Sequence, residues 1–181
     1  MSYVIAIDVG IKNLGLCIFD FRTSTVVEWD NVTLVPSGRY IPAQNVQNVR
    51  TFIHKYKHFF DNAFQVVVER QMRCNMRIIE SVIQALYFDI CIIISPRAVK
   101  MHYNLSTKNY RANKQRAVDW AKLFVLHNTD VFQDGLKQFR DAEKQDDLAD
   151  ALILLLYYLD TYSNQLTASI LDPFTDVELQ G

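Results

Sequence analysis

The strongest constraint on the fold is a short apolar segment near the N-terminus that contains a single carboxylate. Residues 3–9 read Tyr-Val-Ile-Ala-Ile-Asp-Val, an apolar run with Asp8 inside it. Such a run is typical of a central strand that is buried on both faces of a sheet. Because a buried carboxylate without a partner is costly, Asp8 needs a nearby cation or an opening to water.

The rest of the chain predicts an α/β fold around that strand. Short connections between the first three apolar segments favour an antiparallel meander, and an intervening helix allows the later strands to join in parallel. The predicted strands are 3–9, 14–19, 26–34, 64–69 and 90–95, and the predicted helices are 43–61, 74–88, 112–126 and 146–162. We therefore predict a mixed five-stranded sheet, three antiparallel strands and then two parallel ones, flanked by helices.

Length and composition narrow the class of protein further. The 181 residues suit one domain, predicted over 1–163, with a loosely ordered tail at 164–181. Three cysteines without a CxxC pair make a disulfide framework or zinc site improbable on spacing and favour a reducing, intracellular compartment. The longest strongly apolar stretch, residues 151–159, is too short for a bilayer, which takes about 20 residues, so we expect no membrane association.

The net charge of −1 hides two segments of opposite sign. Residues 97–122 carry seven Lys and Arg against one Asp, and residues 141–181 carry nine Asp and Glu against one Lys. These segments are either two solvated surfaces or a phosphate-binding face beside metal-binding carboxylates.

Four acids favour the second interpretation. Asp8 and Glu69 lie in apolar strands, while Asp147 and Asp150 are three residues apart and so share one helix face. Asp146 adds a charge with no assigned role. Alternatively, Asp8 starts a turn, Glu69 pairs with Arg70 or Lys12, and the aspartates only favour the positive end of their helix.

If the four acids converge, their chemistry is specific. Clustered carboxylates repel one another unless a divalent cation neutralises them, and all-oxygen ligands select Mg²⁺ or Mn²⁺. Two such ions about 4 Å apart activate water and stabilise the leaving oxygen in phosphodiester hydrolysis. Lys114, in a basic helix, would then lie near the phosphate being cut, although it also suits a solvated surface. No Ser or Cys has a nucleophile motif.

Five ordered strings resemble the RuvC-type Holliday junction resolvases of the RNase H-like superfamily, especially the branch in poxviruses and other large DNA viruses. They span most of the chain, and they are Ile7-Asp-Val-Gly-Ile-Lys-Asn13, Glu69-Arg-Gln71, Ser95-Pro96, Tyr110-Arg-Ala-Asn-Lys-Gln-Arg116 and Lys144-Gln-Asp-Asp-Leu-Ala-Asp150. Residues 128–143 match nothing in this pattern.

The resemblance implies a role for each matching residue. The metal ligands would be Asp8, Glu69, Asp147 and Asp150, with Lys114 as the basic catalytic residue. DNA contacts would come from Lys12, Arg70, Arg73, Lys100, Lys108, Arg111 and Arg116, and Lys100 is also a weaker candidate for the catalytic lysine. The family is dimeric through the helix predicted at 74–88, here with Met76, Ile79, Ile83 and Leu86. On pattern alone, that face packs equally well on the protein's own sheet.

The resulting hypothesis is a Mg²⁺-dependent endonuclease, with two ions per site, that resolves four-way DNA junctions as a homodimer without a nucleotide cofactor. The resemblance places it in a virus-infected cell, in genome processing and recombination. One alternative is another RNase H-like nuclease acting on RNA or RNA–DNA hybrid, and a second is a nuclease-inactive junction-binding module. An actin-like ATPase shares the first motif but needs a longer chain than 181 residues.

Overall fold

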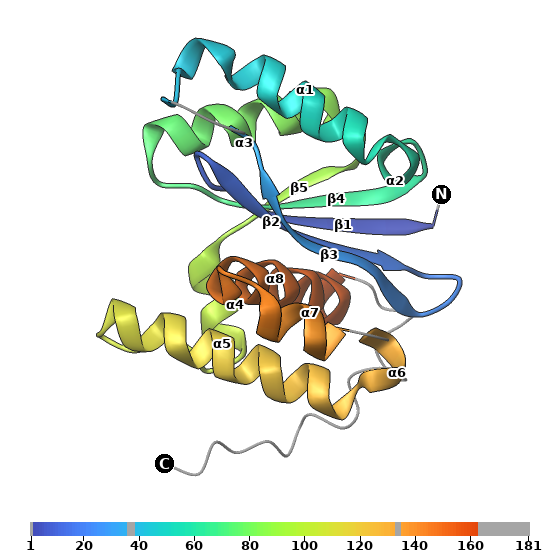
Figure 1. Cartoon of the computed structure of the whole chain (residues 1–181), viewed down its shortest axis with the longest axis vertical. Helices are drawn as coiled ribbons and strands as arrows, with labels where there is room; N and C mark the ends of the chain where they lie inside the picture. The colour runs from blue at the N-terminus through green and yellow to red at the C-terminus, as the bar shows by residue number, and fades with distance from the viewer. Residues whose placement is uncertain (1, 36–38, 133–134, 163–181) are drawn as a thin grey trace.

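A mixed sheet forms the centre of the molecule, in the order β3-β2-β1-β4-β5 (Figure 1). The computed structural model describes residues 2–35, 39–132 and 135–162. Strands β1 to β3 are antiparallel, and β4 and β5 join β1 in parallel. The strands are β1 (Tyr3–Asp8), β2 (Asn13–Asp20), β3 (Thr25–Thr33), β4 (Ala63–Glu69) and β5 (Cys91–Ile94). The predicted sheet is confirmed, whereas the predicted tail at 164–181 lies outside the described residues.

Helices cover both faces of the sheet (Figure 1). On one face lie α1 (Asn45–Lys55), α2 (Lys57–Asp61) and α3 (Cys74–Leu86), with the short 3-10 helices η1 (Pro42–Gln44) and η2 (Phe88–Ile90) nearby in the chain. On the other lie α4 (Pro96–His102), α5 (Tyr110–His127), α6 (Thr129–Phe132), α7 (Gly135–Asp141) and α8 (Gln145–Tyr162).

Strand β1 separates two apolar cores. Val4 and Ala6 belong to the core beneath α5 and α8, and Ile5 and Ile7 belong to the core beneath α1 to α3. This double burial explains why the segment is apolar at consecutive positions. Helix α8 is buried along most of its length because it packs against β1 and β2 on one side and α5 on the other.

The helix predicted at 43–61 is divided in two. Helix α1 ends at Lys55, and Tyr56 leaves the helical conformation with φ −104° and ψ 23° before α2 begins. The Tyr56 hydroxyl donates a hydrogen bond of 3.0 Å to Asp30 Oδ2, so burial of this side chain against the sheet accompanies the break.

Three helices were not predicted. The sequence predicts that Pro96 closes a strand, but Pro96 occupies the first turn of α4, where proline needs no hydrogen-bond donor. Helices α6 and α7 lie within residues 128–143 and cover the edge of β3, where Phe139 stacks on Trp29 with ring centroids 5.1 Å apart. Helix α5 begins two residues before its predicted start, because Asn109 caps it.

The orientation of α3 corrects part of the predicted dimer interface. Ile79 and Ile83 are buried in the protein's own core, packed with the residues of β1 and β4. They are therefore unavailable to a partner in this arrangement. Met76 is partly buried against the same core, whereas Leu86 is 51% exposed.

Candidate active site

The two strand acids meet at one edge of the sheet. Asp8 ends β1 and Glu69 ends β4, and these strands are parallel with Ile7 paired to Val68. The carboxyl ends of both strands therefore open on the same side. The two carboxyl groups are close enough for the charge of Glu69 to raise the pKa of Asp8.

A glycine brings the start of α8 against these strands. Gly15 pairs with Asp8 across the β1–β2 ladder. A Cβ atom at Gly15 would lie 2.2 Å from the carbonyl oxygen of Asp147 and 3.1 Å from the Cβ of Ala151. Only glycine permits so close an approach of helix to strand. The Trp29 indole adds a second attachment, because its Nε1 donates a 2.9 Å hydrogen bond to the carbonyl oxygen of Leu148.

Four carboxyl groups interact at this junction, and we call Asp8, Glu69, Asp147 and Asp150 the carboxylate cluster. Burial, followed by the charges of Glu69 and Asp150, raises the pKa of Asp8 well above its usual value. Burial and the charge of Asp150 raise the pKa of Glu69 to about 7. Burial also raises the pKa of Asp147 and of Asp150. The four residues, which were predicted as one set, are thus within electrostatic reach of one another.

The donor set of the carboxylate cluster fits a hard divalent cation. Its donors are all carboxylate oxygens, and their mutual repulsion is relieved by positive charge. Across residues 2–35, 39–132 and 135–162, no three His, Cys, Asp or Glu side chains are already arranged to hold a metal ion. The fit therefore rests on the chemistry of the donors and on their accumulated charge.

Each acid in the first turns of α8 pairs with a lysine from a different segment. Lys100 Nζ of α4 lies 3.5 Å from Asp150 Oδ1, and Lys144 Nζ lies 3.6 Å from Asp147 Oδ2. Lys114 of α5 forms an ion pair with Asp146. Lys100 was predicted as a DNA contact, but it is mostly buried inside the carboxylate cluster. Sequence reasoning could have found its helix, because Ser-Pro is a helix-start signal.

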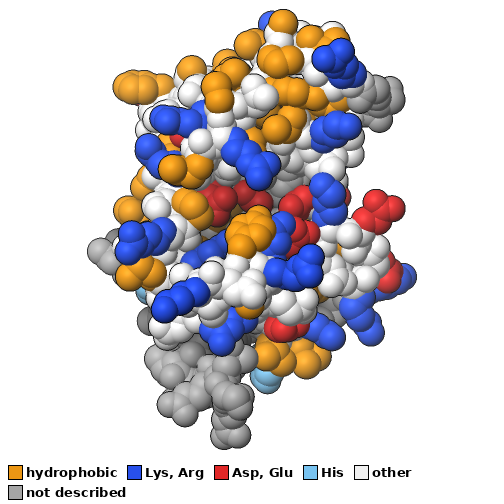
Figure 2. All heavy atoms as spheres, turned by 90° about the vertical axis from the view of Figure 1, so that its left-hand side faces the viewer, with side chains coloured by type: hydrophobic (Ala, Val, Ile, Leu, Met, Phe, Trp, Pro, Cys, Tyr) orange, Lys and Arg blue, Asp and Glu red, His pale blue; other side chains and the backbone are white. Residues whose placement is uncertain are grey.

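The remaining predicted DNA contacts are solvent-exposed. Lys12 lies in the turn after β1, and Arg70 and Arg73 follow β4. Lys108 lies just before α5, and Arg111 and Arg116 lie in its first two turns. None of the six forms an ion pair within the described part of the chain. Figure 2 shows acidic side chains in a hollow across the middle of one face, with Lys and Arg around it.

Sequence reasoning missed a buried network that supports Glu69. Glu80 of α3 is 5% exposed, and its Oε2 accepts a 2.6 Å hydrogen bond from the backbone N–H of Gln71. The Gln71 side chain in turn donates to Glu69 Oε2 at 3.3 Å. The network therefore fixes the loop after β4 and orients the carboxylate of Glu69. Neither Arg70 nor Lys12 pairs with Glu69 in the described residues, which removes that alternative.

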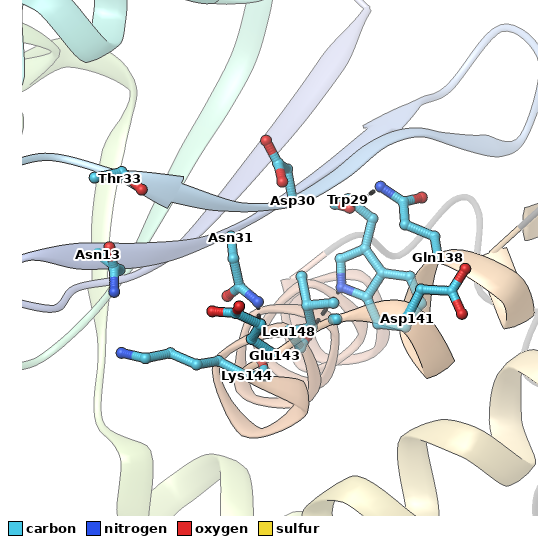
Figure 3. A pocket seen from close by; sticks show the side chains of 11 residues that line it. Asn13, Trp29, Asp30, Asn31, Thr33, Gln138, Asp141, Glu143, Lys144 and Leu148 are labelled. Atoms are coloured by element: carbon cyan, nitrogen blue, oxygen red, sulfur yellow. Dashed lines mark hydrogen bonds between the residues drawn. The ribbon is translucent and has the colours of Figure 1, made fainter. Parts of the chain in front are cut away.

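A cavity of about 360 Å³ borders the start of α8 (Figure 3). Asn31 points toward Lys144 in this cavity, and its Nδ2 donates a 2.9 Å hydrogen bond to the Lys144 carbonyl oxygen. Asp30, Asp141 and Glu143 also line the wall. The acidic side chains repel a phosphate backbone here, and the hydrogen bond from Asn31 helps to hold the residue that precedes α8 against β3.

The amino-acid sequence matches a known protein family over most of its length. The sequence profile described as "Poxvirus A22 protein" matches residues 2–161. The chain belongs to this poxvirus family. No curated protein matches the chain.

Solved structures share the fold at low sequence identity. The fowlpox virus Holliday junction resolvase is 19% identical, with a TM-score of 0.62 over 87% of this chain and 97% of the other. The yeast mitochondrial Holliday junction resolvase Ydc2 is 18% identical, with a TM-score of 0.64 over 88% and 84%. Thermus thermophilus RuvC in complex with a junction substrate is 16% identical, with a TM-score of 0.54 over 90% and 98%. The fold is thus that of RuvC-type resolvases, which confirms the resemblance drawn from the motifs.

Cys17, Cys74 and Cys91 are all free thiols. Among the described helices, none is both long enough and apolar enough to cross a bilayer.

Proposed function

We propose that this protein is a divalent-metal-dependent endonuclease that resolves four-way DNA junctions. The observation that carries the proposal is the carboxylate cluster, which lies at one sheet edge within a border of exposed, unpaired basic side chains. Family membership and the fold of the solved resolvases support the same activity. In a poxvirus family, the substrate would be branched viral DNA in the infected cell.

The residues divide into those that hold metal, those that stabilise charge and those that bind DNA. Asp8, Glu69, Asp147 and Asp150 would hold Mg²⁺ or Mn²⁺, and we expect two ions. When bound, these ions supply an activated water and charge stabilisation for phosphodiester hydrolysis. Lys114 would stabilise the extra negative charge on the phosphate in the transition state. The exposed basic residues would bind the flanking backbone through charge-assisted hydrogen bonds.

The ion pair between Lys100 and Asp150 fits this division. Lys100 is attracted to Asp150 and Glu69, and although burial opposes it, these two acids raise the pKa of Lys100. Lys100 therefore offsets part of the negative charge of the cluster. A divalent ion at Asp150 competes with this lysine, and we expect Lys100 then to turn toward a phosphate oxygen.

The decisive experiment compares three substrates. Purified protein is incubated with a synthetic four-way junction, a matched linear duplex and an RNA–DNA hybrid, each with Mg²⁺ or EDTA. We expect symmetric paired cuts only in the junction with Mg²⁺. Preferential cutting of the hybrid would instead favour the other RNase H-like activity. Tight junction binding without cleavage under any metal condition would favour the nuclease-inactive module.

We also propose that the enzyme acts as a homodimer, because a two-fold dimer presents two sites to a substrate that is itself nearly two-fold. Exposed apolar side chains at the end of α3 and just beyond it suit the interface, with Leu86 51% and Phe88 78% exposed. Leu86→Glu should give a monomer in sedimentation that keeps its circular dichroism but nicks one strand at a time.

Phe64→Glu is the matched control for the interface. Phe64 is a 50% exposed apolar residue at the start of β4, so it receives the same charge at similar exposure. It should leave a dimer with paired cuts. If Leu86→Glu also remains a dimer with paired cuts, the interface lies elsewhere on the surface.

A further inference from the structure

Lys114 is held by an acid outside the carboxylate cluster. Its ammonium group forms an ion pair with Asp146 in the first turn of α8. The same ammonium lies 5.7 Å from the ring centre of Tyr110, one turn earlier on α5. Two groups from two helices thus restrain a side chain that otherwise has many rotamers.

Asp146 differs from its neighbours in what metal binding would change. Successive helix residues are rotated by about 100°, so Asp146 and Asp147 point in different directions. Asp147 and Asp150 pair with Lys144 and Lys100, and a metal ion at those acids competes with both lysines. The Asp146 pair includes no proposed metal ligand. The ion pair between Lys114 and Asp146 can therefore persist when metal is bound to the carboxylate cluster.

We propose that Asp146 is a positioning residue that holds the Lys114 ammonium at the edge of the carboxylate cluster, ready for the phosphate being cut. This inference rests on the proposed nuclease function. Without Asp146, Lys114 keeps its charge but samples more orientations, so fewer enzyme–DNA complexes have it in place. The loss falls on the chemical step rather than on DNA binding.

A double-mutant cycle with single-turnover kinetics tests this role. Lys114→Ala should slow cleavage roughly 100-fold, and Asp146→Asn should slow it roughly tenfold. Adding Asp146→Asn to Lys114→Ala should cause no further loss, because Asp146 acts through the lysine. The dissociation constant of the junction should stay the same or fall slightly in Asp146→Asn, since a negative charge is removed. Asp146→Glu should recover most of the rate.

Asp61→Asn is the matched control, because it removes a carboxylate that also pairs with a lysine, Lys57, within helix α2. It should cleave at the wild-type rate. Mn²⁺ affinity without DNA should be unchanged in Asp146→Asn. A clear loss of Mn²⁺ affinity would identify Asp146 as a metal ligand, and an additive loss in the double variant would show that it acts independently of Lys114; either result overturns the proposal.

A measurement without DNA separates this inference from the proposed function. Nitrogen relaxation of lysine side chains should show the Lys114 ammonium restrained in the wild type and as mobile as exposed Lys108 in Asp146→Asn. If Lys114 is equally mobile in both proteins, the positioning role is wrong even in an active enzyme. If Lys114 is restrained but the wild type cuts no substrate, the nuclease assignment is what fails.

Discussion

Acidic side chains lie at both ends of the sheet, and their surroundings are opposite. At one end Asp20, 3% exposed, accepts hydrogen bonds from both the backbone and the guanidinium of Arg22. The hydrogen bonds from Arg22 lower the pKa of Asp20. At the other end Asp8 and Glu69 face further carboxylates, and burial with these charges raises the pKa of each.

The difference distinguishes a structural acid from a functional one. Arg22 neutralises Asp20, so this acid is explained within the fold itself. The charge of the carboxylate cluster is only partly offset, by Lys100 and Lys144. Such a concentration of like charge is unfavourable in the free protein and is expected where a ligand supplies the missing positive charge. Asp20, Asp8 and Glu69 all lie at strand ends of the same sheet. Their position in a strand therefore does not explain why one acid is neutralised and the others are not.

The largest effect should come from removing an acid at the cluster end. Glu69→Gln or Asp8→Asn should reduce junction cleavage by at least roughly 1,000-fold, because the metal site loses a charged ligand. Junction binding should remain or tighten, since negative charge near the phosphate is removed. Asp20→Asn should instead lose about 1–2 kcal/mol of stability and keep its cleavage rate. Gel assays with urea unfolding separate the two outcomes, and near-normal cleavage by Glu69→Gln would refute the site assignment.

A smaller effect is expected where the strand meets α8. Gly15→Ala places a methyl group against the Asp147 carbonyl and should displace the start of α8. We expect roughly a 10- to 100-fold loss of cleavage from misplaced ligands, with about 1–3 kcal/mol of destabilisation from overpacking.

Gly135→Ala is the control for this substitution. Its Cβ would crowd the Cβ of Phe132 at 2.8 Å, on the side of the molecule that covers β3. It should destabilise the protein without a comparable loss of cleavage by the folded fraction. Equal cleavage losses in both variants would show that Gly15 has no special role at the site.

The two ends should also respond oppositely to pH. In EDTA, the raised pKa of Glu69, about 7 against 4.5, means that the folded state binds more protons. Stability should therefore fall as pH rises from about 4.5 to about 7, and Glu69→Gln should flatten this fall. The lowered pKa of Asp20 stabilises the fold above its usual value of 3.8, and this contribution is lost at lower pH. Urea unfolding from pH 3 to 8 measures both trends, and Mg²⁺ should stabilise more at pH 8 than at pH 5.

The strand acids could be predicted because their signals are local. Apolar runs around Asp8 and Glu69 identify buried strands, and parallel pairing then brings their ends together. The spacing of Asp147 and Asp150 likewise reveals a shared helix face. Each inference needs only the sequence of one strand or helix, together with the geometry of parallel strand pairing or of the helical turn.

The missed features depend on contacts between distant segments. Helix α6 has four residues and α7 has seven, too few to show a periodicity, and their packing on Trp29 is not visible locally. The apolar pattern of α3 is equally compatible with packing against a dimer partner and against the protein's own sheet. Only the structure shows that Ile79 and Ile83 face the core. The pairing of Asp146 with Lys114 joins residues 32 positions apart.

The smallest predicted effect concerns the exposed basic residues around the cluster. Lys108→Ala and Arg111→Ala should each weaken junction binding a few-fold and reduce the slope of log affinity against log salt by about one. Lys57→Ala, which changes a lysine near the start of β4, should alter neither quantity. Titrations at several salt concentrations with EDTA present isolate binding from cleavage. If Lys57→Ala lowers the slope as much as Lys108→Ala, DNA contacts both ends of the sheet, and the division between a structural and a functional end is wrong for binding.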